Sequence, residues 1–248
     1  MMTLNHVRRD APWKWLRAGW QDFMRAPRVS LTYGGIFVLI GAIIILGLKA
    51  TGLSSSIPVA LSGFALIAPA FAVGIYQVSR ALERGETPRF RVIISRFPDR
   101  ISQIGFLSIL LALLLLLWFR VAQILLVVLA PDSPLEATAF VNYLLTDSAG
   151  LTLLIVGTVF GAALATLAFA ISALSFPLLV DRDIDAITAL ATSFKAVMTQ
   201  PFVMLTWAWL IAFVMGAGSA LFGIGIAVAF PWIALATWHA YRDFLPPA

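Results

Sequence analysis

Long apolar segments alternate with short polar segments along this chain of 248 residues. An α-helix rises about 1.5 Å per residue, so about 20 apolar residues cross the hydrocarbon core of a membrane. The pattern therefore predicts an all-α membrane protein, with six transmembrane helices in a single membrane domain over residues 1–248. The predicted helices occupy residues 30–49, 57–79, 104–128, 151–179, 201–219 and 221–240.

An amphipathic pattern precedes the first and fifth apolar segments. Residues 12–33 and 186–207 place apolar side chains three or four positions apart, which is the spacing of one helix face. Pro27 and Pro201 follow at equivalent positions. Because proline disfavours the helical conformation for the residue before it, we expect each amphipathic helix to end there and a membrane helix to begin.

The pattern occurs a third time in a weaker form, at Phe90, Ile93 and Phe97. The ends of the second and sixth segments also correspond, since "PAFAVGIYQVSR" and "PWIALATWHAYR" align Arg80 with Arg242. Repetition at such a period indicates a repeated architecture. We therefore predict three parallel repeats, each an interfacial amphipathic helix followed by a two-span hairpin. The repeats cover about residues 12–80, 88–182 and 184–243, after a mobile N-terminal tail at 1–11.

Composition and charge agree with a multi-pass protein. Hydrophobic residues make up 61% of the chain and charged residues only 12%, whereas a soluble domain is nearer a quarter charged. With six spans, most of the 17 basic residues lie on one side of the membrane, which marks that side as cytoplasmic. We expect both termini in the cytoplasm and no nucleic-acid partner, because the positive charge is spread over the loops of one face.

The first amphipathic segment combines tryptophan with basic residues. Such a helix lies in the plane of a membrane and binds an anionic cytoplasmic leaflet. An alternative is that it docks a cytoplasmic partner. The predicted interface anchors are Trp13, Trp15, Trp20, Arg17, Arg25 and Arg28.

Three aspartates follow the fourth apolar segment at every second position: Asp181, Asp183 and Asp185. A calcium-binding EF-hand loop that starts at Asp181 would need glycine and glutamate where the chain has Ala186 and Thr192. Asp185 directly precedes an amphipathic helix, where aspartate caps free N–H groups. We therefore predict a helix cap at Asp185 and the end of a span at Asp181, with no metal site.

Arg120 is the one charge inside a predicted span. A buried arginine in a membrane is a candidate functional residue, and Gln123 lies one turn further on the same face. It could bind an anionic ligand, a lipid headgroup, or a carboxylate in the following loop. In the alternative interpretation, Arg120 extends to the outer membrane surface. The candidate carboxylates are Asp132, Glu136 and Asp147.

His239 lies near the end of the sixth segment, beside Trp238, Tyr241 and Arg242. It could relay protons or bind a ligand, since histidine titrates near neutral pH. The alternative is an interfacial position in a belt of aromatic side chains. Neither His239 nor Arg120 forms a catalytic pair with another group in the sequence, so we expect no enzymatic activity.

Three stretches carry a likeness to known proteins: "APWKWLRAGWQDFMRAPRVSLTYGGIFVLIGAIIIL", "SFPLLVDRDIDAITALATSFKAV" and the segment from Pro231 to Asp243. They resemble a bacterial family of predicted integral membrane proteins of uncharacterised function, which implies a location in the bacterial inner membrane. Some members of that family are labelled as similar to cytochrome c oxidase subunit I, which holds two haems and a copper through histidines. This chain has only His6 and His239, so we expect no haem, copper or other cofactor.

The function that we expect is a non-catalytic accessory, assembly or scaffold role in a membrane complex, which implies a membrane-protein partner. The alternative is a transporter, or a protein that binds lipids or small molecules, with Arg120 in a central cavity.

Overall fold

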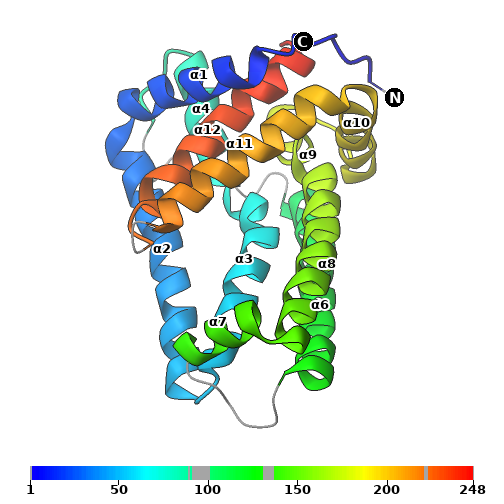
Figure 1. Ribbon diagram of the computed structural model, residues 1–248. Helices are drawn as coiled ribbons and strands as arrows, with labels where there is room; N and C mark the ends of the chain where they lie inside the picture. Colours follow the sequence, from blue (N-terminus) through cyan, green and yellow to red (C-terminus); the bar gives the residue numbers. More distant parts are fainter. Residues whose placement is uncertain (1, 89, 91–100, 131–136, 221–222, 248) are drawn as a thin grey trace. The chain divides into compact units, whose positions relative to one another are not determined.

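The computed structural model describes residues 2–88, 90, 101–130, 137–220 and 223–247 (Figure 1). All regular structure in these residues is helical. The chain divides into two compact units. Unit 1 comprises Met1–Leu39, Pro69–Ser108 and Phe169–Ala248, and unit 2 comprises Ile40–Ala68 and Ile109–Ala168. The α-helices are α1 (Ala11–Arg25), α2 (Pro27–Ala50), α3 (Ile57–Phe71), α4 (Val73–Glu83), α6 (Ile101–Leu129), α7 (Ala137–Thr146), α8 (Ser148–Ser172), α9 (Ser175–Asp181), α10 (Ala186–Thr199), α11 (Pro201–Ala220) and α12 (Ile226–Phe244).

Five of the six predicted spans are confirmed as helical segments that are long and apolar enough to cross a membrane. The sixth predicted span falls in α12, which is not among the five found in the described residues. Most of the α12 side chains are buried inside unit 1, including Trp238, Tyr241 and Phe244. The five segments are Pro27–Ala50, Ile57–Glu83, Ile101–Leu129, Ser148–Asp181 and Pro201–Ala220.

Two helix junctions have the same backbone conformation. Ala26, between α1 and α2, has φ −131° and ψ 51°, and Gln200, between α10 and α11, has φ −132° and ψ 57°. Each residue precedes a proline, which excludes the α conformation at that point. The predicted ends of both amphipathic helices are therefore confirmed. In the weaker third copy, Ile93 and Phe97 lie outside the described residues.

Helix α1 packs closely along α12 in unit 1. A Cβ atom added to Gly19 would lie 2.5 Å from the backbone nitrogen of Ala236, so the two backbones touch. Trp232 of α12 donates its indole N–H to the carbonyl of Leu16. Trp15 is only 2% exposed. It is a core residue, which corrects its assignment as a membrane-interface anchor.

The N-terminal segment is held in place, which corrects the prediction of a mobile tail. The Gln200 side chain accepts a hydrogen bond from Val7 N (2.8 Å) and donates one to Asn5 O (2.7 Å). Asn5 N donates to Phe244 O at the end of α12 (3.0 Å), and Lys195 donates to Met2 O. The two ends of the chain are therefore neighbours within unit 1.

Unit 2 contains a close packing of helices around Trp118 of α6. Its indole N–H donates to Val59 O of α3 at 3.0 Å. Gly63 of α3 and Gly161 of α8 both face this ring, and a Cβ atom at either would lie within 3.4 Å of it. Small residues that allow such approach are typical of membrane helix packing.

Asp185 is the N-cap of α10, as its position in the sequence predicts. Its carboxylate accepts hydrogen bonds from the backbone N–H of Thr188 (2.8 Å) and from the Thr188 hydroxyl (2.6 Å). In addition, Gln103 of α6 accepts from Ala186 N (2.8 Å), so a second free N–H group of this helix start is satisfied.

Replacing Asp185 by alanine should lower the melting temperature by roughly 2–4 °C, the effect of losing one typical cap. Hydrogen bonds from the Thr188 side chain and backbone hold the pKa of Asp185 below its ordinary value of 3.8. A lowered pKa contributes stability above the unfolded-state value and loses it as the pH falls. The difference from the parent protein, measured by circular dichroism melts, should therefore shrink below about pH 4. Ile187→Ala, on a side chain that is 68% exposed in the first turn of the same helix, is the control and should change the melting temperature less than the loss of the cap.

Candidate functional site

Three helices of unit 1 contact one another in pairs: α4, α9 and α12, which we call the exit helices. Each follows or contains a proline near the end of an apolar segment: Pro69, Pro177 or Pro231. Tyr76 of α4 and Trp238 of α12 stack with ring centroids 6.5 Å apart. These two residues occupy equivalent positions in the sequence alignment of the two segments, so the structure places corresponding residues face to face.

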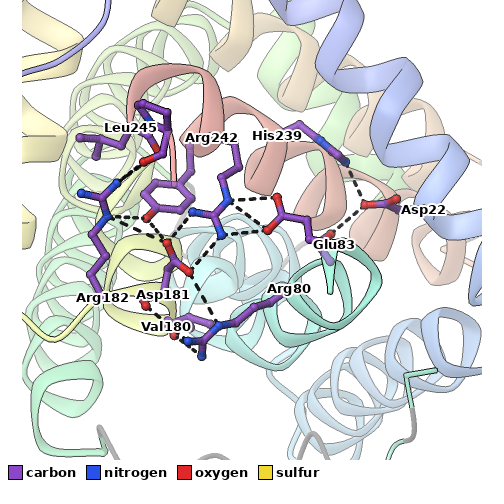
Figure 2. A network of polar contacts seen from close by, with 12 residues as sticks. Asp22, Arg80, Glu83, Val180, Asp181, Arg182, His239, Arg242 and Leu245 are labelled. Carbon is purple, nitrogen blue, oxygen red and sulfur yellow. Dashed lines mark hydrogen bonds and ion pairs between the residues drawn. The ribbon is translucent and has the colours of Figure 1, made fainter. Parts of the chain in front are cut away.

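Asp181, the last residue of α9, binds both other exit helices (Figure 2). Arg242 of α12 donates to both carboxylate oxygens, at 2.5 and 3.0 Å. Tyr241 donates its hydroxyl to Oδ2 at 2.6 Å. Arg80 of α4 places its Nε 3.7 Å from Oδ1. The bidentate arginine and the low side-chain exposure of Asp181, 12%, make this a strong charge-assisted contact.

Arg242 also binds α4 through Glu83. Its Nε lies 3.0 Å from Oε1, and a terminal nitrogen lies 2.8 Å from Oε2. Burial alone would lower the pKa of Arg242, but the hydrogen bonds and charges of Glu83 and Asp181 raise it above its ordinary value. The guanidinium also lies 4.8 Å from the ring centroid of Trp238. Arg242 is therefore a permanent cation that joins two carboxylates from two helices.

Two further arginines hold backbone carbonyl groups. Arg80 donates to Val180 O at 2.9 Å and to Asp181 O at 3.4 Å, and these are the last two carbonyls of α9. Arg182 donates to the Tyr241 hydroxyl at 3.2 Å and to the carbonyls of Leu245 and Pro246 after α12. Cations at helix C-termini satisfy free carbonyls and the negative end of the helix dipole.

A second polar cluster joins α1 to the exit helices. Asp22 of α1 is 5% exposed, and its Oδ2 accepts from Ser79 of α4 at 3.1 Å. The same oxygen lies 2.9 Å from Nε2 of His239 on α12. Arg25 lies 3.8 Å from the other carboxylate oxygen. His239, predicted as a ligand or proton relay, thus has a structural partner inside the protein.

The other predicted site residues lie elsewhere. Arg120 and Gln123 are both exposed in unit 2, and Arg120 donates to the Gln123 side chain at 3.3 Å. Among the carboxylates proposed for Arg120, Asp147 instead accepts from Ala149 N and Gly150 N at the start of α8. Asp132 and Glu136 lie outside the described residues. The remaining anchors are exposed: Trp13, Trp20, Arg17, Arg25 and Arg28.

The chemistry of these clusters is that of fixed ion pairs. Ser79 and His239 both bind Asp22 rather than each other, so the histidine is not placed to activate the serine as a nucleophile. Around Asp181 the arginines outnumber the carboxylates, which disfavours a cation site. Within the described part of the chain, no group of three or more His, Cys, Asp or Glu could hold a metal ion.

The role of Asp181 was missed at the level of sequence, where it was interpreted only as the end of a span. One signal was present. Arg80 and Arg242 occupy equivalent positions in the two aligned segments, and Asp181 ends an apolar segment that lies between them in the sequence. Predicting ion pairs between residues so far apart in the sequence requires knowing which helix ends lie close together.

Comparison with known proteins gives one match. A family model described as "Predicted integral membrane protein (DUF2189)" matches residues 56–181, just over half of the chain. The matched region covers α3 to α9 and ends at Asp181. No curated protein and no solved structure matches.

Proposed function

We propose that this chain, which belongs to the DUF2189 family of predicted integral membrane proteins, is a non-catalytic accessory, assembly or scaffold factor for a complex in the bacterial inner membrane. The observation that carries the proposal is that ionic groups near the helix ends of unit 1 bind one another. Asp181, Arg242, Glu83 and Asp22 all connect different helices. Such groups fix an arrangement of helix ends, which is what a scaffold requires.

One face that remains for a partner is the apolar side of α11. On α11, exposed aromatic and aliphatic side chains recur at intervals of three or four residues, along one side of the helix. Trp209 and Phe213 stack there at 5.4 Å. In a membrane such a face contacts lipid or another membrane helix. The residues are Phe202, Leu205, Trp209 and Phe213, which are 56% to 69% exposed.

Photo-crosslinking on this face tests the proposal. A photoreactive amino acid at Trp209, which is 56% exposed, should capture a membrane protein in native membranes. The same amino acid at Trp207, two residues away and 1% exposed, is the matched control and should capture none. A protein that purifies only as a monomer after mild crosslinking, with lipid adducts alone at position 209, would count against a scaffold role.

We also propose that both termini are cytoplasmic and that α11 and α12 form the third of three parallel two-span hairpins. The bond between Asn5 and Phe244 supports an even number of crossings, because it keeps both chain ends on one side. The matching junctions at Ala26 and Gln200 support the repeat. The exposed arginines of α1 and the start of α2 fit an anionic cytoplasmic leaflet.

The hairpin tip provides the topology test. Ala227, near the start of α12, contacts Gly34 in the second turn of α2, so the tip lies near a cytoplasmic helix start. In six complete crossings, a cysteine at Ile224, which is 73% exposed, should react with an impermeant thiol reagent from the periplasmic side. Reaction from the cytoplasmic side alone would replace the sixth crossing with a hairpin that enters and leaves on one face.

A further inference from the structure

Two of the exit helices, α4 and α9, follow breaks inside the long apolar segments that contain them. Between α8 and α9 the helix is interrupted at Ala173–Leu174, and the N–H of Leu174 donates to the Ser193 side chain instead of a helix carbonyl. Between α3 and α4 it is interrupted at Ala72, three residues after Pro69. Interruptions in the ladder of helix hydrogen bonds are the usual sites of bending.

The far end of α9 carries the ionic ties. Arg242 and Arg80 hold the Asp181 carboxylate and the last two carbonyls of α9. Directly after Asp181 the backbone is extended, with Arg182 at ψ 151°, so α9 ends here and does not continue as a longer helix. α9 therefore has a helix break at its start and a cluster of ionic contacts at its end.

We propose that Asp181 is an ionic latch. It holds α9 against α4 and α12 in the closed arrangement of Figure 2, and its release lets α9 swing about Ala173–Leu174 and separate from the other two exit helices. Packed elements switch between discrete arrangements rather than deform continuously, so we expect the loss of this charged contact to populate a second position of α9. This inference goes beyond the proposed scaffold role, because it concerns motion within one chain.

Distance measurement between spin labels tests the latch. The chain contains no cysteine, so labels attach only where cysteine is introduced. Arg84→Cys, at the exposed end of α4, and Asp183→Cys, exposed after α9, report the separation of these two helices. With Asp181 intact we expect one narrow distance distribution in nanodiscs. Asp181→Asn, which removes the charge but keeps the size, should add a longer and broader component.

Asp185→Asn is the matched control, since it removes the same charge from the same loop but only from a contact with Thr188. It should keep the narrow distribution. An unchanged distribution in Asp181→Asn, or equal broadening in both variants, overturns the latch. If Asp181→Asn does not fold, Arg80→Gln decides in the same way, because it removes the α4 half of the ties. The measurement uses purified protein without a partner, so its outcome is separate from that of the scaffold test.

Discussion

Replacing Trp15 by alanine should lower the free energy of unfolding by about 3–5 kcal/mol, the usual loss for a large buried aromatic side chain. The ring is 2% exposed and packs edge-on against Trp207 at 5.5 Å and against Phe244 at 6.1 Å. Its indole N–H donates to Asp243 at 2.6 Å, so the substitution also removes a hydrogen bond between α1 and α12. Three helices, α1, α11 and α12, lose a shared contact.

The matched control is Trp13→Ala, two residues earlier in α1. Trp13 is 57% exposed, and its removal from the protein surface in detergent should change the free energy of unfolding by less than about 0.5 kcal/mol. Unfolding in mixed micelles, followed by circular dichroism, measures both variants without relying on tryptophan fluorescence. Equal small losses in the two variants would mean that Trp15 is an interface anchor and that α1 does not pack on α12 as described.

Features encoded by local sequence were predictable. The five spans follow from length and hydropathy, because any helix of that length and composition is stable in a bilayer. Helix ends at Ala26 and Gln200 follow from the proline that comes next. The cap at Asp185 follows from an acidic side chain directly before an amphipathic pattern. Each of these signals acts over a few neighbouring residues.

Features that depend on the tertiary arrangement were not predictable in the same way. Trp13 and Trp15 have the same side chain in the same aromatic and basic segment, and only the position of α12 decides that one is exposed and the other buried. Similarly, α12 is apolar because it packs among protein helices, and hydropathy does not distinguish that from contact with lipid. The partners of Asp181 come from segments 61 and 101 residues away.

These long-range contacts share one physical feature, which is that they join helix ends rather than helix centres. Asp22 and Trp15 of α1 and Asp181 of α9 all bind residues in the last two turns of α12 or α4. Burying a charged side chain in the hydrocarbon core costs much more free energy than placing it near the membrane surface. Ion pairs between membrane helices therefore form mainly at the helix ends. The arrangement of the helices in unit 1 therefore depends on these polar contacts, which a hydropathy profile does not reveal.

Replacing Gly34 by alanine should destabilise the protein by about 1–3 kcal/mol, as expected of an overpacked contact. A Cβ atom at this position would lie 1.9 Å from the carbonyl oxygen of Ala227 and 2.6 Å from its carbonyl carbon. Both atoms belong to the backbone, so relief requires α12 to move away from α2. One turn further along α2, Phe37 stacks on Phe230 with centroids 3.9 Å apart, and the same movement would weaken that contact.

Gly35→Ala is the matched control, because the next residue on the same helix has nothing within 4 Å of an added Cβ atom. Alanine has a higher helix propensity than glycine, by up to about 1 kcal/mol, so this variant should be unchanged or more stable. In the same unfolding assay, only Gly34→Ala of these two adjacent substitutions should lower the stability. If Gly34→Ala is as stable as Gly35→Ala, α12 does not meet α2 at Ala227, and the hairpin tip lies at a different level of the membrane from the one that the contact implies.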